Sequence, residues 1–258
     1  MIAQAYLTEW GTRAPWPTAT QVEQDLILSR LIVEIAEHPL LSRELAFRGG
    51  TCLHKLHLPT ARRYSEDLDY VRTGSEPRLG EIFAALRDIA IERVGLRERR
   101  RRFPSEDSDV GCIWFDADVT SEAGRIRIKI EINIAETEPF HYYIKRSYAV
   151  QSRWWSGAAQ VPRFELGELL ATKLRALYQR RKGRDLFDLW VALDIVGIDD
   201  QVVVDACSIT WATPSTATAG SSATSSASSS IGSSWRISTS SSPSSPLAMS
   251  HARRPRRS

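Results

Sequence analysis

The sequence lacks the features that mark secreted, membrane-spanning and zinc-binding proteins. Its three cysteines, Cys52, Cys112 and Cys207, are far apart and odd in number, and none belongs to a C-x-x-C pair. A disulfide framework and a structural zinc site are therefore not expected. No N-terminal run has the basic, apolar and small-residue regions of a signal peptide, and no apolar stretch approaches the roughly 20 residues that a membrane helix needs. These absences predict a soluble protein in the reducing cytoplasm.

The body of the chain also lacks an excess of basic residues. The 258-residue sequence has a formal charge of +3, but five arginines and no acidic residue follow Cys207, so the preceding part carries 29 basic and 31 acidic residues. Any nucleic-acid contact in the body must therefore come from a local patch. Arg97–Arg102 is one candidate, although a solvated helix end is the favoured interpretation of this charge run.

Apolar residues become scarce after Cys207, and from Trp211 onward 18 of 48 residues are serine. Such a segment cannot bury enough apolar surface to offset its ordering entropy, which predicts disorder for residues 208–258. The composition changes within a helical pattern rather than at a linker. We hypothesise that a frameshift in a GC-rich gene replaced the native C-terminus. Translation of the other two frames downstream of codon 207 tests this, because two frames without a helical pattern would exclude it.

The hydrophobic pattern predicts a mixture of helices and strands. Thr20 and Glu23 have the spacing of a capping box at the start of a helix over Val22–Ala36. Alternate isoleucines from Ile126 to Ile134 predict a half-buried strand. The other predicted strands are Leu45–Phe47, Leu68–Val71 and Gly111–Val119, and the other predicted helices are Thr51–Leu58, Arg78–Val94 and Glu168–Ala192, the last with a break at Gly183.

The residues most suited to chemistry are a glycine pair and two aspartates. Gly49, Gly50 and Thr51 lie between a predicted strand and a predicted helix, where glycine lets the backbone approach a phosphate closely. Asp67 and Asp69 alternate with Leu68, so on a strand both carboxylates face the same side. Oxygen ligands of this kind hold Mg²⁺. The alternative interpretation is a glycine turn followed by two solvated acids.

Glu131 is the best candidate for a third carboxylate, because it lies on the polar face of the isoleucine strand. Three carboxylates on adjacent strands could hold two metal ions that activate a hydroxyl and stabilise a leaving pyrophosphate. Alternatively, Glu131 is a solvated residue paired with a lysine. His54 and His57 have no cysteine partners and are interpreted as surface or packing residues.

Three ordered motifs resemble those of the AbiEii/AbiGii toxin family, nucleotidyltransferases of type IV toxin–antitoxin and abortive-infection systems. The first motif combines Gly49–Thr51 with Arg63–Asp69, and the second is Lys129–Ile132. The third is helical and combines Glu168–Leu177 with Arg184–Leu189. Together the motifs cover about residues 45–195, and their order and spacing agree with the family.

This resemblance implies an α+β fold, with a DNA polymerase β-like nucleotidyltransferase core built on a mixed sheet and a helical C-terminal lobe. We expect the core and its N-terminal helix within residues 1–150 and the lobe within residues 151–207. The implied reaction transfers a nucleoside monophosphate from an NTP, with Mg²⁺ or Mn²⁺, to an RNA acceptor, with tRNA favoured. The resemblance also implies a cognate antitoxin as partner.

The resemblance assigns roles to individual residues. Asp67, Asp69 and Glu131 would be the metal ligands and catalytic acids, and Lys173 would contact the triphosphate and neutralise charge as pyrophosphate leaves. The acidic partner in the helical lobe would be Asp188, a catalytic residue, or Asp185, which would lie at the nucleotide. The remaining nucleotide-binding residues would be Gly49, Gly50, Thr51, Arg63 and Ser65.

The position of Lys173 on its predicted helix supports this role, because Lys173 lies apart from the apolar stripe and would be free to reach a cleft. An exposed helix lysine is the alternative. Two other functions are compatible with the same residues. One is a nucleotidyltransferase acting on a small molecule, and the other is a nucleotide- or partner-binding protein disabled by its altered C-terminus.

Overall fold

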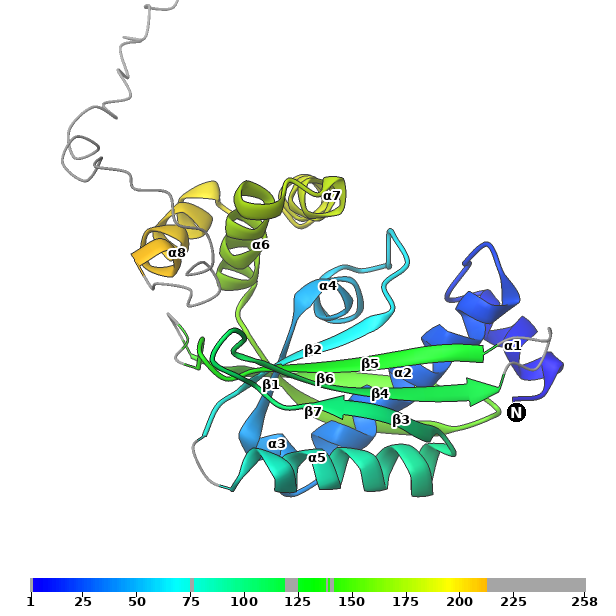
Figure 1. The fold of residues 1–258 in the computed structure, drawn as a ribbon. Helices are drawn as coiled ribbons and strands as arrows, with labels where there is room; N and C mark the ends of the chain where they lie inside the picture. Colours follow the sequence, from blue (N-terminus) through cyan, green and yellow to red (C-terminus); the bar gives the residue numbers. More distant parts are fainter. Residues whose placement is uncertain (1, 75–76, 119–124, 138, 140–141, 213–258) are drawn as a thin grey trace, which may run out of the picture. The chain divides into compact units, whose positions relative to one another are not determined.

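The computed structural model describes residues 2–74, 77–118, 125–137, 139 and 142–212 (Figure 1). All of them belong to one compact unit, Met1–Gly220. Most of the predicted disordered segment, from residue 213 to residue 258, lies outside the described residues, as does Val119, the last residue of a predicted strand. Residues 208–212, however, belong to a helix, so the prediction of disorder from residue 208 is wrong for them.

The centre of the unit is a seven-stranded mixed sheet with the order β3-β4-β5-β2-β1-β7-β6. The pairs β2–β5 and β1–β7 are parallel, and the other neighbouring pairs are antiparallel. The predicted mixed sheet is therefore confirmed. The strands are β1 Leu45–Arg48, β2 Asp67–Arg72, β3 Arg97–Arg102, β4 Val110–Asp118, β5 Arg125–Asn133, β6 Ile144–Gln151 and β7 Ser156–Arg163.

Strand β3 corrects the interpretation of Arg97–Arg102 as a solvated helix end. The preceding helix ends earlier, at Gly95, whose left-handed backbone (φ 81°) terminates it. The arginines then pair with β4 as an edge strand of the sheet. Local charge density suggested a helix end, whereas pairing with the next strand of the chain, β4, decides the conformation.

The N-terminal helices are α1 (Gln4–Gly11), α2 (Ala19–Glu37) and the single turn α3 (Leu41–Glu44). The capping box of α2 is formed by Thr18 and Gln21, not by Thr20 and Glu23. Both pairs have the required spacing, and Thr18 is the residue with extended backbone that an N-cap needs. Further along the chain are the short helix α4 (Gly49–Cys52) with the π-helical turn η1 (Leu53–His57), and α5 (Leu79–Asp88) with η2 (Ile89–Val94).

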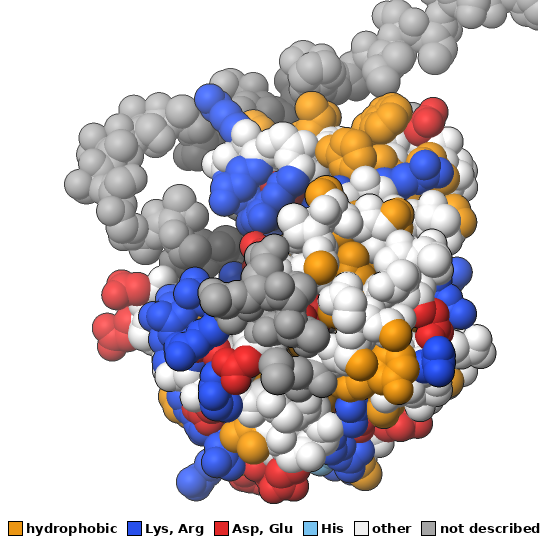
Figure 2. Space-filling model, turned by 90° about the vertical axis from the view of Figure 1, so that its right-hand side faces the viewer, with side chains coloured by type: hydrophobic (Ala, Val, Ile, Leu, Met, Phe, Trp, Pro, Cys, Tyr) orange, Lys and Arg blue, Asp and Glu red, His pale blue; other side chains and the backbone are white. Residues whose placement is uncertain are grey.

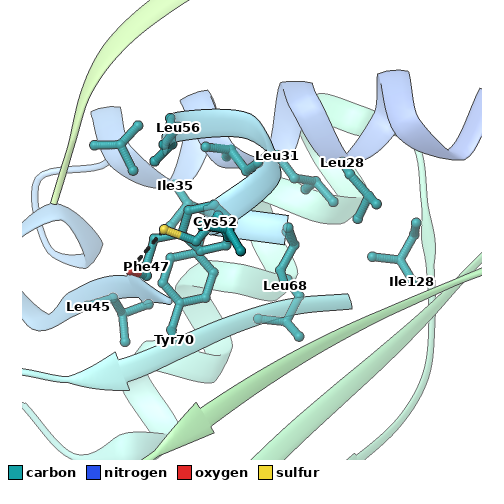
Figure 3. Close-up of a cluster of buried hydrophobic side chains, with 14 of the residues drawn as sticks. Leu28, Leu31, Ile35, Leu45, Phe47, Cys52, Leu56, Leu68, Tyr70 and Ile128 are labelled. Atoms are coloured by element: carbon teal, nitrogen blue, oxygen red, sulfur yellow. Dashed lines mark hydrogen bonds between the residues drawn. The ribbon is translucent and has the colours of Figure 1, made fainter. Parts of the chain in front are cut away.

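The core lies on the isoleucine face of β5. Ile126, Ile128, Ile130 and Ile132 are each at most 1% exposed, and fully burying a side chain of this size contributes about 1.5–3 kcal/mol. Ile134 lies just beyond the strand and is half-buried. Side chains of α2, β1, β2, α4 and η1 meet at this face, as Figure 3 shows for Leu28, Leu31, Ile35, Phe47, Cys52, Leu56, Leu68, Tyr70 and Ile128. The opposite face of β5 carries the polar residues of the strand.

The C-terminal part begins with a strand rather than a helix, which corrects the expected helical segment over residues 151–207. Strand β7 ends at Arg163, and the helices follow. They lie on the side of the sheet opposite α5 (Figure 1). They are α6 Leu166–Arg180, α7 Gly183–Val191 with η3 Ala192–Val196, and α8 Asp200–Ala212. The predicted break at Gly183 is confirmed, because Gly183 begins α7.

The helix α7 and the following turn η3 leave apolar side chains uncovered. Leu186, Trp190 and Leu193 are 58%, 57% and 40% exposed, and hydrophobic side chains gather at the height of these helices in Figure 2. Within the part of the chain that the structure describes, no helix has both the length and the apolar character needed to cross a membrane.

Candidate active site

The parallel pairing of β2 and β5 brings the three predicted carboxylates to one face of the sheet. Asp69 is opposite Glu131 in the register, and Asp67 is opposite Lys129. Because side chains alternate along a strand, Asp67, Asp69, Lys129 and Glu131 all point away from the isoleucine core. The structure therefore gathers residues that are more than 60 positions apart in the sequence.

The two glycines are required by the side chains packed against them. Gly49 has a left-handed backbone (φ 83°), and a Cβ added to it would overlap the carboxylate of Asp69. A Cβ added to Gly50 would lie 2.6 Å from Arg63 Nη2 and 3.2 Å from Ser65 Oγ. The glycine turn thus lets β1 approach both the carboxylates and the predicted phosphate-binding residues.

Thr51 has a buried hydroxyl that holds this turn in place. Its Oγ1 lies 2.6 Å from the carbonyl oxygen of Asp67 and 2.8 Å from Ser65 Oγ. These contacts tie α4 to the start of β2. The sequence suggested a nucleotide contact for Thr51, and its placement indicates that it positions Asp67 and Ser65.

The carboxylates differ in their electrostatic environments. Burial raises the pKa of Asp69 to about 6, and the nearby charges of Glu131 and Asp67 add to this shift. Burial also opposes ionisation of Glu131, but the hydrogen bond and charge of Lys129 outweigh it and lower the pKa of Glu131. Burial would lower the pKa of Lys129, yet Glu131 and Asp67 raise it to about 12. The carboxylate cluster thus concentrates negative charge and attracts a cation.

Lys129 supplies a cation to this cluster. Its Nζ lies 3.1 Å from Asp67 Oδ2 and 3.0 Å from Glu131 Oε1. Among the described residues, no group of three or more His, Cys, Asp or Glu side chains is arranged so that it could hold a metal ion without rearrangement. The candidate donors on Asp67, Asp69 and Glu131 are all carboxylate oxygens, and two of the three carboxylates contact the Lys129 ammonium, so the set fits a hard divalent ion. Lys129 would have to release a carboxylate to admit it.

A second cluster surrounds Asp188, which is fully buried. Its Oδ1 accepts hydrogen bonds from His54 Nε2 (2.9 Å) and Arg63 Nε (2.7 Å), and its Oδ2 accepts one from Arg63 Nη2 (2.6 Å). Lys173 Nζ lies 2.8 Å from Oδ2. Burial opposes ionisation of Asp188, but the hydrogen bonds from His54 and Arg63 and the charge of Lys173 hold its pKa well below its usual range.

Lys173 is buried on α6, so the alternative of an exposed helix lysine is wrong. Besides Asp188, its ammonium lies 3.5 Å from Asp185 Oδ1. Asp185 is also fully buried and accepts two hydrogen bonds from Arg180, of 3.0 and 3.1 Å. Of the two acids considered for the helical lobe, Asp188 is the one that joins Arg63 of the first motif to Lys173 of the third.

His54 has a partner that its interpretation as a surface or packing residue did not include. Its Nδ1 accepts a hydrogen bond from the backbone nitrogen of Arg62 (3.2 Å), so Nε2 carries the proton that is donated to Asp188. His57 is also buried, and burial together with the neighbouring Arg163 lowers its pKa to about 3. Their spacing of three on a short helix indicated a shared face but not the partner 134 residues away.

Arg48 is a further charged residue of the site, and no role was predicted for it from the sequence. It is opposite Asp69 in the register, and its Nη1 donates a hydrogen bond of 2.6 Å to Glu136. Arg175 of α6 pairs with the other carboxylate oxygen of Glu136. The Arg48–Glu136–Arg175 cluster connects the acidic face of the sheet to α6. In the sequence, the feature that could have indicated Arg48 is its position directly before Gly49 and Gly50.

Comparison with known protein families finds a match over most of the chain. A family model for the AbiEii nucleotidyl transferase toxin of type IV toxin–antitoxin systems matches residues 30–243. No curated protein matches the chain.

Several solved structures are similar, among them one from Mycobacterium tuberculosis and one from Helicobacter pylori. MenT4, a nucleotidyltransferase toxin from Mycobacterium tuberculosis H37Rv, has 18% sequence identity and a TM-score of 0.55, over 81% of this chain and 70% of its own. JHP933 from Helicobacter pylori has 17% identity and a TM-score of 0.47, over 72% of each chain. The likeness to MenT4 confirms the predicted fold class. The match of the family model over most of the sequence goes further: the chain is a nucleotidyltransferase and belongs to the AbiEii toxin family of type IV toxin–antitoxin systems.

Proposed function

We propose that this nucleotidyltransferase transfers a nucleoside monophosphate from an NTP to an RNA acceptor, with tRNA as the acceptor and Mg²⁺ or Mn²⁺ as the metal. The observation that supports the proposal is the adjacency of the carboxylate face to the glycine turn and the basic residues around it. Arg63 Nη2 lies beside Gly50 and is bound to Asp188, which also holds Lys173. Type IV membership further suggests a cognate antitoxin as partner.

In this proposal the carboxylate cluster binds the metal ion, and the basic residues around Asp188 bind the phosphates. Asp67, Asp69 and Glu131 would hold the divalent ion. Arg63 and Lys173, which both contact Asp188, would have to turn toward the triphosphate to bind it. A bound divalent ion would stabilise the charge that develops on the transferring phosphoryl group. The acceptor hydroxyl oxygen bonds to the α-phosphorus, the bond from this phosphorus to the bridging oxygen breaks, and pyrophosphate leaves with its charge neutralised by Lys173. The hydroxyl proton passes to the carboxylate cluster.

Incubation with each labelled NTP, Mg²⁺ and total tRNA tests the proposal. We expect wild-type protein to label RNA with at least one NTP, and Asp69→Ala to lower labelling by about 100-fold or more, because misplaced or lost groups at the reacting centre cost this much. Asp88→Ala is the matched control, since Asp88 is an exposed aspartate on α5 whose side chain is 55% exposed. Absence of labelled RNA with every nucleotide would refute the RNA acceptor, and label on a small molecule alone would replace it.

A further inference from the structure

The carboxylate face does not end at β5 but continues across two more strands to the edge of the sheet. Trp114 of β4 is opposite Lys129, and Arg100 of β3 is opposite Trp114. A parallel row runs from Glu131 through Cys112 to Arg102. Partners in register share a face. Two rows of side chains therefore lead from the carboxylates to β3.

The outer ends of these rows carry positive charge beside an aromatic ring. The guanidinium carbon of Arg100 lies 4.0 Å from the ring centroid of Trp114. Arg102 Nη2 donates a hydrogen bond of 3.4 Å to Cys112 Sγ. An aromatic ring and a thiol do not cancel the charge of a guanidinium. Both arginines are exposed and Trp114 is half-buried.

Two other arginines of β3 are paired with carboxylates. Arg97 is paired with Asp118 at 2.7 Å. Arg101 is paired with Glu98 at 2.7 Å, and Glu98 also contacts Arg87 of α5, on the opposite face of the sheet. Figure 2 shows Lys and Arg side chains gathered at the height of the sheet. On the catalytic face of β3, Arg100 and Arg102 therefore differ from Arg97, because they contact an aromatic ring and a thiol rather than a carboxylate.

We propose that Arg100, Arg102 and Trp114 form a binding platform for the single-stranded end of the RNA acceptor. The platform rests on the proposed RNA acceptor and adds the surface that holds it. Because Arg100 lies over one face of the Trp114 ring, a base of any identity stacks on the exposed side of this Arg100–Trp114 pair, and Arg102 contacts a neighbouring phosphate. This combination of side chains fits an unpaired RNA end better than a small acceptor, which needs no contact so far from the carboxylates.

The direction of the reaction supports this placement. Gly50, Arg63 and Lys173, the proposed triphosphate side, lie on the β1 and α6 side of the carboxylates, whereas the platform lies on the β4 and β3 side. In phosphoryl transfer the attacking and leaving oxygens are roughly in line. The acceptor must therefore approach from the side opposite the leaving pyrophosphate, which is the side of the platform.

The reach of the platform matches a short single strand. Three steps between neighbouring strands separate Asp67 on β2 from Arg100 on β3. At about 4.8 Å a step, these span roughly 14 Å. Stacked nucleotides rise about 3.4 Å each, so about four would fit between the carboxylates and the sheet edge.

The test measures binding of a 5′-labelled single-stranded RNA oligonucleotide and of total tRNA, across a range of salt concentrations. We expect the double variant Arg100→Ala/Arg102→Ala to weaken RNA binding about tenfold. We also expect it to reduce the slope of log affinity against log salt by roughly 0.7 per arginine. Trp114→Ala should weaken binding about tenfold, and Trp114→Phe should restore most of it because a π face remains. Arg101→Ala is the matched control, from the same strand but the opposite face, and should bind RNA as wild type does.

The outcomes separate the platform from the proposed function. The KM for the NTP should stay unchanged in the double variant while the KM for RNA rises about tenfold. If wild-type protein labels RNA but the double variant binds RNA as tightly, the platform is wrong and the RNA acceptor stands. An increase in the NTP KM alone, or an equal loss in Arg101→Ala, would also overturn the platform. If the wild-type chain binds no RNA and labels another acceptor, such as a protein, both are wrong.

Discussion

Replacing Gly49 with alanine should separate the folding cost of a glycine turn from its catalytic cost. A non-glycine residue in the left-handed conformation costs about 1–2 kcal/mol, and Gly49 has φ 83°. The new Cβ would also overlap the carboxylate of Asp69. Asp69 must therefore move, and a displacement of about 1 Å at a reacting centre costs on the order of 100-fold in rate.

Gly95→Ala is the matched control for this substitution. Gly95 has nearly the same backbone, with φ 81°, but nothing lies within 4 Å of its added Cβ. Both variants should lose about 1–2 kcal/mol from backbone strain, which lowers Tm by about 2–8 °C for a unit of this size. Only Gly49→Ala should lose activity.

The assay is nucleotide transfer by both variants, with thermal unfolding followed by circular dichroism. We expect kcat/KM of Gly49→Ala to be about 100-fold below that of Gly95→Ala at a temperature where both are folded. If the two variants have activities within about threefold of each other, the contact between Gly49 and Asp69 does not position the carboxylate, and the reasoning is refuted.

Two further variants address the charged clusters. Asp188→Asn should lower the free energy of unfolding at pH 7 by about 3–5 kcal/mol, because Arg63 and Lys173 would lose a buried counter-charge. The folded-state pKa of Asp188 is depressed, so its stabilisation is complete above the unfolded pKa of about 3.9 and is lost as the pH falls toward the folded value. Urea unfolding at pH 7 and pH 3 checks this, and an undiminished difference at pH 3 would contradict it. Lys129→Met removes the ammonium between Asp67 and Glu131, and we expect about tenfold tighter Mn²⁺ binding, or ~1.4 kcal/mol. Calorimetric titration measures it, and unchanged or weaker binding would show that Lys129 does not compete with the metal.

Much of the fold follows from local pattern. The alternation from Ile126 to Ile132 predicts β5 and its buried face, because that face has a period of two in any half-buried strand. The same rule places Glu131 on the acidic face. Strand β3 could not be predicted in this way, because Arg97–Arg102 has no apolar periodicity and becomes a strand only by pairing with β4.

The contacts around Asp188 also could not be predicted from the sequence. Asp188, Lys173 and Arg63 were predicted as functional residues by resemblance, but their joint contact was not. His54 was interpreted as a surface or packing residue because a histidine in a short helix has no partner visible in the sequence. Its hydrogen bond to Asp188 spans 134 positions, and only the folded chain brings the two together.

The sequence by itself determined which residues could do chemistry, because backbone freedom at Gly49 and the spacing of Asp67 and Asp69 are local properties. Tertiary structure decided what those residues do. In the folded chain, the carboxylate of Asp69 lies directly beside Gly49, and Lys129 lies between two carboxylates. Lys173 is buried beside Asp188. The physical reason is that charge and desolvation depend on distances across the fold, whereas a sequence records only distances along the chain.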